Sequence, residues 1–235
     1  MAGDDLKRAV GYAAVDEFVR SGMKIGMGTG STAVWAIRRI GEKLASGDLE
    51  SIVGVATSSQ AELECQEHGI PLRSLNDPEI GGALDLTIDG ADEIDRSGRL
   101  TKGGGGALLV EKIVAYASAR MVVVADTKKV VDQLGLSFPV PLEVLPLARV
   151  PVITALGQLG GTAVVRAAQR KMGAVISDNG NLIVDVRFSE SFDPRAMETD
   201  LSTIPGVLGN GLFTRIDPII LLATESGRVE RMAIG

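Results

Sequence analysis

The first half of the chain alternates between two hydrophobic patterns. Apolar residues that recur at helical spacing predict helices over residues 5–20, 32–45, 59–68 and 107–119. Short apolar runs between them predict strands over residues 24–28, 52–57, 84–89 and 121–125. Strands that alternate with helices usually form a parallel sheet with helices on both faces. We therefore expect an α/β fold with a mostly parallel, Rossmann-like sheet.

The pattern becomes less regular after about residue 133, where several prolines interrupt the chain. Shorter elements follow, with helices predicted over 154–159 and 194–203 and strands over 163–167 and 182–188. Residues 219–224 again form a continuously apolar strand pattern, which we expect to rejoin the first sheet. The sequence thus predicts an α/β catalytic domain of residues 1–133 and 206–235. Residues 134–205 are expected to form a smaller inserted α+β domain.

Composition excludes several classes of protein. The net charge is −6 and Lys and Arg are scattered, which argues against nucleic acid as the main partner. No apolar run reaches the length of about 20 residues that a membrane helix needs, and the acidic N-terminus does not look like a signal peptide. The single cysteine, Cys65, excludes an internal disulfide framework. We therefore expect a cytoplasmic protein that acts on a small molecule.

A glycine-rich segment joins the first predicted strand to the next helix. It reads Gly26-Met-Gly28-Thr29-Gly30-Ser31-Thr32. Glycine lets the backbone turn with a positive φ and approach a ligand closely. The helix start supplies N–H groups and the positive end of the helix dipole, and three hydroxyl groups add donors. Such loops lie beyond the carboxyl ends of the strands, where ligands bind. We favour a phosphate monoester as this ligand.

Two other interpretations of the loop stay open. Gly28, Gly30 and Ala33 fit a loose dinucleotide-binding fingerprint. That fingerprint includes an acidic residue after the second strand, whereas this strand ends in Ala-Thr-Ser-Ser at 56–59. The segment could also be a tight turn with an N-cap serine. A P-loop is excluded, because no Gly-Lys-Ser/Thr sequence closes the loop.

Asp89 ends a strongly apolar strand, and Asp92 follows one turn later, with Gly90 and Ala91 between them. Three interpretations compete for the two carboxylates. They could bind sugar hydroxyls and relay protons, they could form a solvated acidic turn, or they could hold a hard cation such as magnesium. The metal interpretation ranks third, because the spacing does not fit a calcium-binding loop.

The most informative segment follows the aspartates. Lys102 precedes four glycines, of which Gly103, Gly104 and Gly105 are the first three. Successive backbone N–H groups in such a loop can stabilise a developing oxyanion. Glu111 lies early in the following predicted helix, and a buried glutamate beside this loop would be a candidate general base. An isolated helical glutamate is more often a solvated surface residue, and this alternative stays open.

A pair of lysines, Lys128 and Lys129, follows the valine-rich strand that ends near residue 125. A lysine at the carboxyl end of a strand lies at the ligand edge of the sheet, so one of the two could reach a phosphate. The other is expected to be an ordinary exposed residue. His68 and Cys65 lie outside every motif, and we interpret both as structural.

Together these motifs resemble the type A ribose-5-phosphate isomerases. The resemblance rests on the segments at 26–32, 89–94, 102–105 and 111–112. The later segments at 140–144, 178–181, 204–206 and 211–213 also resemble the family. Gly106 departs slightly from the family, in which alanine is equally common at this position. The similarity extends in order over nearly the whole chain.

The resemblance implies an aldose–ketose isomerase of the pentose phosphate pathway, with neither metal nor coenzyme. It would interconvert D-ribose 5-phosphate and D-ribulose 5-phosphate. Glu111 would be the base that moves a proton between C2 and C1 through an enediol. Asp89, Asp92 and Lys102 would contact the sugar, and Asp89 would assist ring opening.

The resemblance also assigns the remaining substrate contacts and the assembly. The phosphate would be surrounded by Thr29, Gly30, Ser31, Thr32, Lys129 and Lys7. The sugar would contact Gly90, Ala91, Gly103, Gly104 and Gly105. The family implies a homodimer or homotetramer, with the inserted domain contributing to assembly or acting as a lid. The competing hypotheses are a related sugar-phosphate deaminase or lactonase and a non-catalytic sugar-phosphate sensor.

Overall fold

The computed structural model describes residues 3–170 and 172–234, and the chain forms two compact units. Unit 1 comprises Met1–Ala91, Ile113–Lys129 and Ile216–Gly235. Unit 2 comprises Asp92–Lys112 and Val130–Arg215. The domain division at residues 134 and 205 expected from the sequence stays a prediction. It differs from the compact units mainly in residues 92–112, which carry several of the candidate catalytic residues.

Unit 1 is built on a six-stranded sheet in the order β13-β12-β6-β3-β1-β2. Its strands are β1 (Lys24–Met27), β2 (Val53–Ala56), β3 (Leu86–Asp89), β6 (Met121–Asp126), β12 (Ile219–Ala223) and β13 (Val229–Arg231). Neighbouring strands are parallel except for β12 and β13. β12 pairs with β6, which confirms that the last apolar run rejoins the first sheet.

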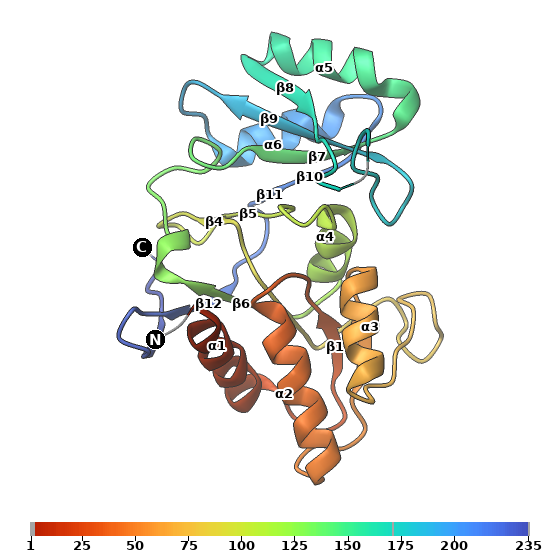
Figure 1. The fold of residues 1–235 in the computed structure, drawn as a ribbon, viewed down its shortest axis with the longest axis vertical. Coiled ribbons are helices and arrows are strands. Elements are labelled where there is room, and N and C mark those ends of the chain that lie inside the picture. The colour runs from red at the N-terminus through yellow and green to blue at the C-terminus, as the bar shows by residue number, and fades with distance from the viewer. Residues whose placement is uncertain (1–2, 171, 235) are drawn as a thin grey trace. The chain divides into compact units, whose positions relative to one another are not determined.

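Helices pack on both faces of this sheet. They are α1 (Gly3–Phe18), α2 (Ala33–Ser46), α3 (Ser59–Glu67) and α4 (Leu108–Tyr116). Figure 1 shows α1 and α2 side by side, and their buried residues share one core cluster with Ile25 and Met27 of β1. Gly26 points the other way, since a Cβ there would meet Val114 of α4. The expected α/β fold class is thereby confirmed.

Unit 2 contains two antiparallel sheets. The larger has the order β10-β7-β9-β8, and the smaller has the order β11-β5-β4. Their strands are β4 (Glu93–Ile94), β5 (Leu100–Thr101), β7 (Val140–Val144), β8 (Gly161–Val165), β9 (Leu182–Phe188), β10 (Val207–Asn210) and β11 (Leu212–Phe213). The helices α5 (Arg149–Gln158) and α6 (Pro194–Thr203) contribute Val152, Leu156, Met197 and Leu201 to a core cluster with β7 and β9.

The proline-rich part of unit 2 differs from the sequence expectation. β7 runs through Pro141, where the prolines were expected only to interrupt the chain. Proline has no N–H to donate, but the carbonyl of Pro141 still accepts a hydrogen bond from the Gly211 N–H (2.7 Å). The helix expected at 154–159 begins earlier, at Arg149, with Pro151 in its first turn. The first N–H groups of a helix lack intrahelical partners, so proline is tolerated there.

A buried ion pair links α4 to α6 within unit 2. The Lys112 ammonium donates to Glu198 Oε1 (2.8 Å), to the Leu212 carbonyl (2.7 Å) and to Asn210 Oδ1 (3.3 Å). Burial lowers the pKa of Lys112, and the adjacent Glu198 carboxylate opposes that shift. The pair therefore needs both partners, because removing one leaves an uncompensated buried charge.

We expect Glu198→Gln to destabilise the protein by roughly 3 to 5 kcal/mol, because it leaves the Lys112 ammonium without its counter-charge. The free energy of unfolding in urea measures this effect. A lysine whose pKa is lowered by folding binds its proton more tightly in the unfolded state, so stability rises with pH. The difference in free energy of unfolding between the variant and the wild type should therefore shrink between about pH 7 and about pH 10. Glu190→Gln, at an exposed carboxylate, is the matched control, and equal stability of both variants would contradict the account.

The single cysteine of the chain gives a second test. Cys65 is fully buried in α3, and burial raises the pKa of its thiol to about 12. The thiolate is the reactive form, so we expect very slow alkylation of the native protein at about pH 8 and fast alkylation in urea. Mass spectrometry after iodoacetamide treatment measures both rates, and equal rates would show that the thiol is accessible.

Candidate active site

The parallel strands of unit 1 bring several expected site residues to one edge of the sheet. β1, β3 and β6 lie side by side, so their carboxyl ends meet. The loop of residues 28–32 follows β1, Asp89 ends β3, and a 3₁₀ turn, η1 (Thr127–Lys129), follows β6. Ligands of open α/β sheets bind at this edge.

Gly28 allows the glycine-rich loop to approach the neighbouring strand closely. Its N–H donates to the Ile88 carbonyl (3.0 Å), and a Cβ at this position would lie 2.6 Å from the Asp89 Cα. Gly30 has a φ of +101°, which favours glycine. Thr32 is the N-cap of α2, and its side chain makes no capping hydrogen bond. The loop thus has the features of an anion-binding helix start.

Asp89 is held from two sides. The residue is fully buried. Its Oδ1 atom accepts hydrogen bonds from the Thr29 N–H (3.0 Å) and the Gly90 N–H (2.7 Å). The bond from Thr29 connects Asp89, the last residue of β3, to the loop that follows β1. The loop and the first aspartate, which were expected to serve one ligand, therefore form one hydrogen-bonded group in unit 1.

Sequence reasoning missed the hydroxyl groups at the end of β2. The Thr29 hydroxyl lies 2.7 Å from that of Thr57 and 2.6 Å from that of Ser58, and Gln60 Oε1 accepts from the Gly30 N–H (3.1 Å). The sequence had shown only that an acidic residue is absent there. The parallel pairing of β1 with β2 was the available signal, because it places the two strand ends next to each other.

The three candidate lysines of unit 1 differ in their surroundings. Lys128 is exposed and forms an ion pair with Glu225 (3.7 Å). Lys129 is half-buried at the end of η1, directly after the ligand edge of β6. Lys7 lies in α1 and forms an ion pair with Asp4 (3.7 Å). The choice of Lys129 over Lys128 as the substrate-binding lysine stays a prediction.

Unit 2 holds the second group of expected residues. The Gly104 N–H donates to Asp92 Oδ2 (2.7 Å), and a Cβ on Gly104 would lie 2.6 Å from Asp92 Oδ1. Gly103 has a φ of +107°, which a side chain would strain. The backbone N–H of Asp92 donates to the Thr101 carbonyl (2.8 Å), which fixes the start of this segment. The second aspartate and the glycine run are therefore in direct contact.

Lys102, directly before the glycine run, forms a buried ion pair with Glu111, in the helix that follows the run. Their side chains are almost fully enclosed, at 3% and 6% exposed, and the Lys102 ammonium lies 3.4 Å from Glu111 Oε2. Glu111 lies in the first turn of α4. Lys102 is anchored by its N–H, which donates to the Gly211 carbonyl (2.8 Å), and its ammonium lies 5.6 Å from the centre of the Phe213 ring. The burial of Glu111 rules out the alternative that this glutamate is a solvated surface residue.

A second contact with the glycine run was missed. Arg166, which follows β8, donates to the carbonyls of Gly103 (3.0 Å) and Gly104 (2.9 Å). Asp185 of β9 accepts two hydrogen bonds from the same guanidinium. No motif marks Arg166, since it lies 63 residues from Gly103 in the chain. Only the fold of unit 2 brings them together.

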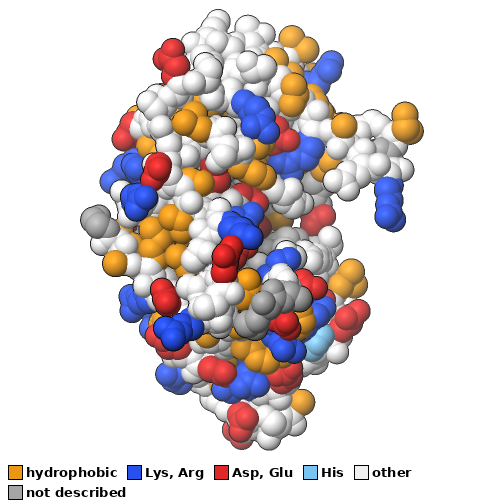
Figure 2. Space-filling model, turned by 60° about the vertical axis from the view of Figure 1, so that its left-hand side comes forward, with side chains coloured by type: hydrophobic (Ala, Val, Ile, Leu, Met, Phe, Trp, Pro, Cys, Tyr) orange, Lys and Arg blue, Asp and Glu red, His pale blue; other side chains and the backbone are white. Residues whose placement is uncertain are grey.

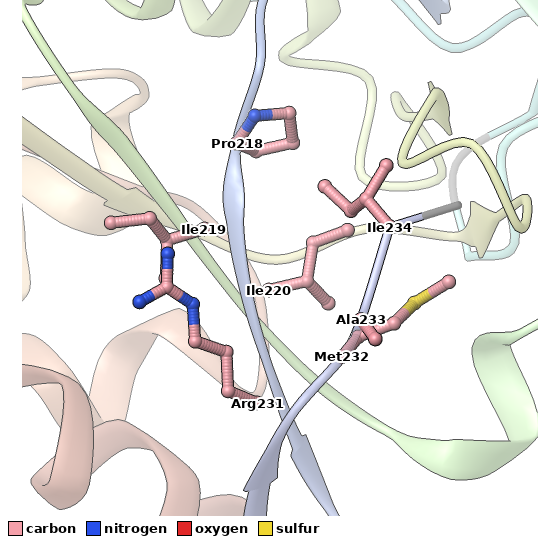
Figure 3. A pocket seen from close by; sticks show the side chains of 7 residues that line it. All are labelled: Pro218, Ile219, Ile220, Arg231, Met232, Ala233 and Ile234. Atoms are coloured by element: carbon pink, nitrogen blue, oxygen red, sulfur yellow. The ribbon is translucent and has the colours of Figure 1, made fainter.

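Two other features of unit 1 contain none of these residues. A cavity of about 400 Å³ is lined by residues 218–220 and 231–234, and Figure 3 shows it between β12 and the segment after β13. Glu64, Glu67 and His68 cluster closely enough to share a cation, but Glu64 already forms an ion pair with Arg38 (2.5 Å). Neither feature contains an expected substrate-binding residue.

The surface and helix lengths bear on the expected partners. Figure 2 shows basic and acidic side chains interspersed over the visible face. Within the described residues, every helix is too short or too polar to cross a membrane.

Comparison with known proteins identifies the family. Residues 53–227 match the family model of ribose 5-phosphate isomerase A, also called phosphoriboisomerase A. The chain is 45% identical to ribose-5-phosphate isomerase A of Treponema denticola, over 98% of this chain and 99% of that protein. It is 47% identical to the protein of the same name from Synechococcus sp. strain WH7803, over 96% and 94%.

Solved structures agree with the sequence matches. The structure of ribose 5-phosphate isomerase A from Methanocaldococcus jannaschii is 41% identical, with a TM-score of 0.90 over 98% of this chain and 100% of that chain. A D-ribose-5-phosphate isomerase in complex with phospho-erythronic acid is 42% identical, with a TM-score of 0.93 over 98% and 99%. The expected resemblance, fold class and isomerase function are confirmed. The chain therefore belongs to the ribose 5-phosphate isomerase A family, whose members are aldose–ketose isomerases.

Proposed function

We propose that this protein interconverts D-ribose 5-phosphate and D-ribulose 5-phosphate through an enediol, with Glu111 as the base. The observation that carries the proposal is the buried pair of Glu111 and Lys102, 3.4 Å apart, which lie after and before the glycine run. The reaction needs a base that serves two adjacent carbons and a cation near the oxygen that gains charge. Glu111 and Lys102 supply these two groups.

The chemical step moves one proton between carbons. In the open-chain aldehyde, the Glu111 carboxylate removes the proton from C2, and the electron pair forms the C1–C2 double bond as O1 takes up a proton from water. Glu111 then returns the proton to C1 while O2 gives its proton to water, which leaves the ketone at C2. Lys102 stabilises the negative charge on the sugar oxygens during both transfers. We assign the N–H groups of Gly103, Gly104 and Gly105 to the same task.

The aspartates orient the sugar and assist ring opening. Two N–H groups fix Asp89 Oδ1, so the carboxylate has a defined direction for contact with a sugar hydroxyl. Asp92 is fixed in the same way by the Gly104 N–H. We propose that both carboxylates contact one substrate molecule.

The phosphate end of the substrate is assigned to unit 1. The residues are Thr29, Gly30, Ser31, Thr32, Lys129 and, with fewer observations in support, Lys7. The start of α2 offers N–H groups and a favourable dipole for an anion. The phosphate takes no part in the chemistry, but its binding orients the sugar over the base.

We further propose a homodimer or homotetramer that works in the cytoplasm. The family resemblance supports the assembly, with residues 134–205 contributing to it or acting as a lid. The single cysteine supports a reducing compartment, because the chain has no internal disulfide to form. The proposed chemistry uses side chains and backbone N–H groups of the chain, and we assign no metal or coenzyme to it.

The base is tested by Glu111→Gln, which keeps the size of the side chain and removes its ability to accept a proton. We expect kcat with ribose 5-phosphate to fall by about 10²- to 10⁴-fold, the usual contribution of a general base. Binding of phospho-erythronic acid, followed by calorimetry, should persist. Glu62→Gln, at an exposed carboxylate of α3, is the matched control. Near-normal turnover by the Glu111 variant would show that another group is the base.

The two adjacent lysines test the assignment of the phosphate end. We expect Lys129→Ala to raise KM for ribose 5-phosphate by about 10-fold or more, because it removes a charge-assisted contact to the phosphate. Lys128→Ala should leave KM nearly unchanged, since Lys128 is exposed and paired with Glu225. Steady-state kinetics of the two variants decide the question. The assignment is wrong if the Lys128 variant shows the larger change.

A further inference from the structure

Arg166 and Asp185 form a well-defined pair in unit 2. The guanidinium donates through Nε to Asp185 Oδ2 (2.8 Å) and through a terminal nitrogen to Oδ1 (2.5 Å). Such two-point contacts between Arg and a carboxylate fix the orientation of the guanidinium plane. The backbone of Arg166 is also fixed, because its N–H donates to the Ile183 carbonyl (2.8 Å) and its carbonyl accepts from Val175 (2.8 Å). The side chain therefore leaves a rigid strand end in a set direction.

The remaining terminal nitrogen of Arg166 contacts the glycine run. It donates to two successive carbonyls, those of Gly103 (3.0 Å) and Gly104 (2.9 Å). In a trans peptide the N–H points away from the C=O of the same peptide plane. Holding these carbonyls therefore directs the N–H groups of Gly104 and Gly105 away from Arg166.

The direction of the first of these N–H groups has a visible consequence. The Gly104 N–H donates to Asp92 Oδ2 (2.7 Å), so Arg166 fixes the peptide that holds Asp92. A glycine run has no side chains to hold its peptide planes, and glycine is the most flexible residue. The Gly106 N–H also donates to the Gly103 carbonyl (2.9 Å), so the Gly104–Gly105 peptide plane depends most on Arg166. Without that partner this plane is free to turn its carbonyl toward a bound anion, which would repel the anion. Arg166 occupies the carbonyls and so excludes that arrangement.

We propose that Arg166, oriented by Asp185, is a positioning residue for the isomerisation. It fixes the peptide planes at 103–105, so that Gly104 holds Asp92 and the Gly105 N–H is directed to the oxyanion that develops on the sugar. This inference rests on the proposed function, because it assumes that these amides face the enediolate. Arg166 is not itself assigned a contact with the substrate.

The experiment compares Arg166→Ala and Arg166→Lys with the wild type, with Arg39→Ala as the matched control. Arg39 makes a similar two-point contact with Asp16 (3.0 and 3.1 Å) in unit 1, far along the chain from the glycine run. We expect kcat of Arg166→Ala to fall by about 100-fold, the cost of a misplaced catalytic group and the lower end of the range for a lost oxyanion donor. KM should change less than about threefold. Arg166→Lys should be intermediate, and Arg39→Ala should retain wild-type kcat.

A second measurement separates positioning from loss of structure. Phospho-erythronic acid carries a carboxylate in place of the reacting carbon, so its affinity should fall together with kcat in Arg166→Ala. The affinity for inorganic phosphate, which probes the loop of residues 28–32, should not change. Added guanidinium should restore part of the kcat. Unchanged kcat would overturn the proposal, as would an equal loss of kcat, phosphate affinity and unfolding midpoint.

If Arg166→Ala does not fold, Asp185→Asn provides the same test. The amide keeps the shape of the carboxylate but loses its charge, so the guanidinium is held less firmly. We expect a smaller fall in kcat with the same unchanged phosphate affinity, and wild-type kcat in this variant would contradict the proposal. Failure of the positioning role leaves the Glu111→Gln result unaffected. Failure of Glu111 as the base would instead appear in Glu111→Gln with Arg166 intact.

Discussion

The burial of Lys102 and Glu111 is the constraint on which the rest of unit 2 depends. Removing two charges from water is costly, and the structure offsets this only where the charges face each other and other polar groups. The 3.4 Å separation places the two charges against each other, and the Phe213 ring, 5.6 Å from the Lys102 ammonium, adds a cation–π attraction. A base and a cation held in such surroundings are already oriented before substrate arrives, which lowers the reorganisation needed during reaction.

Backbone orientation is the second element of the account. Both halves of the candidate site use glycine where a side chain would clash or strain, as at Gly28 beside Asp89 and at Gly104 beside Asp92. In each case a backbone N–H holds an aspartate, through Thr29 in unit 1 and through Gly104 in unit 2. The freedom that glycine gives must be limited from outside, and Arg166 does this for the second loop. The need to orient the backbone therefore explains both Gly104, which belongs to a motif, and Arg166, which no motif marks.

Much of unit 1 could be predicted from sequence, because its strands and helices have long, clear hydrophobic periods. The return of residues 219–224 to the first sheet followed from their continuously apolar pattern. Unit 2 was harder, since β4, β5 and β11 are only two residues long and β7 contains Pro141. Such elements depend on pairing with distant segments, and a local pattern does not record that pairing.

The candidate site divides in the same way. The glycine loops, the aspartates and Glu111 were found because they stand close together in short motifs. The contacts of Arg166 and Thr57 were not, because they depend on which strands become neighbours. Their types gave no signal either, since arginine and threonine are common on any surface. Sequence thus identified the groups proposed for the chemistry, and the structure was needed for the residues that hold them in place.

The central claim, that one carboxylate carries a proton from C2 to C1, is tested most directly by running the isomerisation in heavy water. Nuclear magnetic resonance of the ribulose 5-phosphate formed locates the label. The account predicts deuterium at C1 in one of the two stereochemical positions, because a single fixed base delivers it from one side of a planar enediol. Label divided equally between the two positions would contradict the account, because it would require proton delivery from both faces of the enediol.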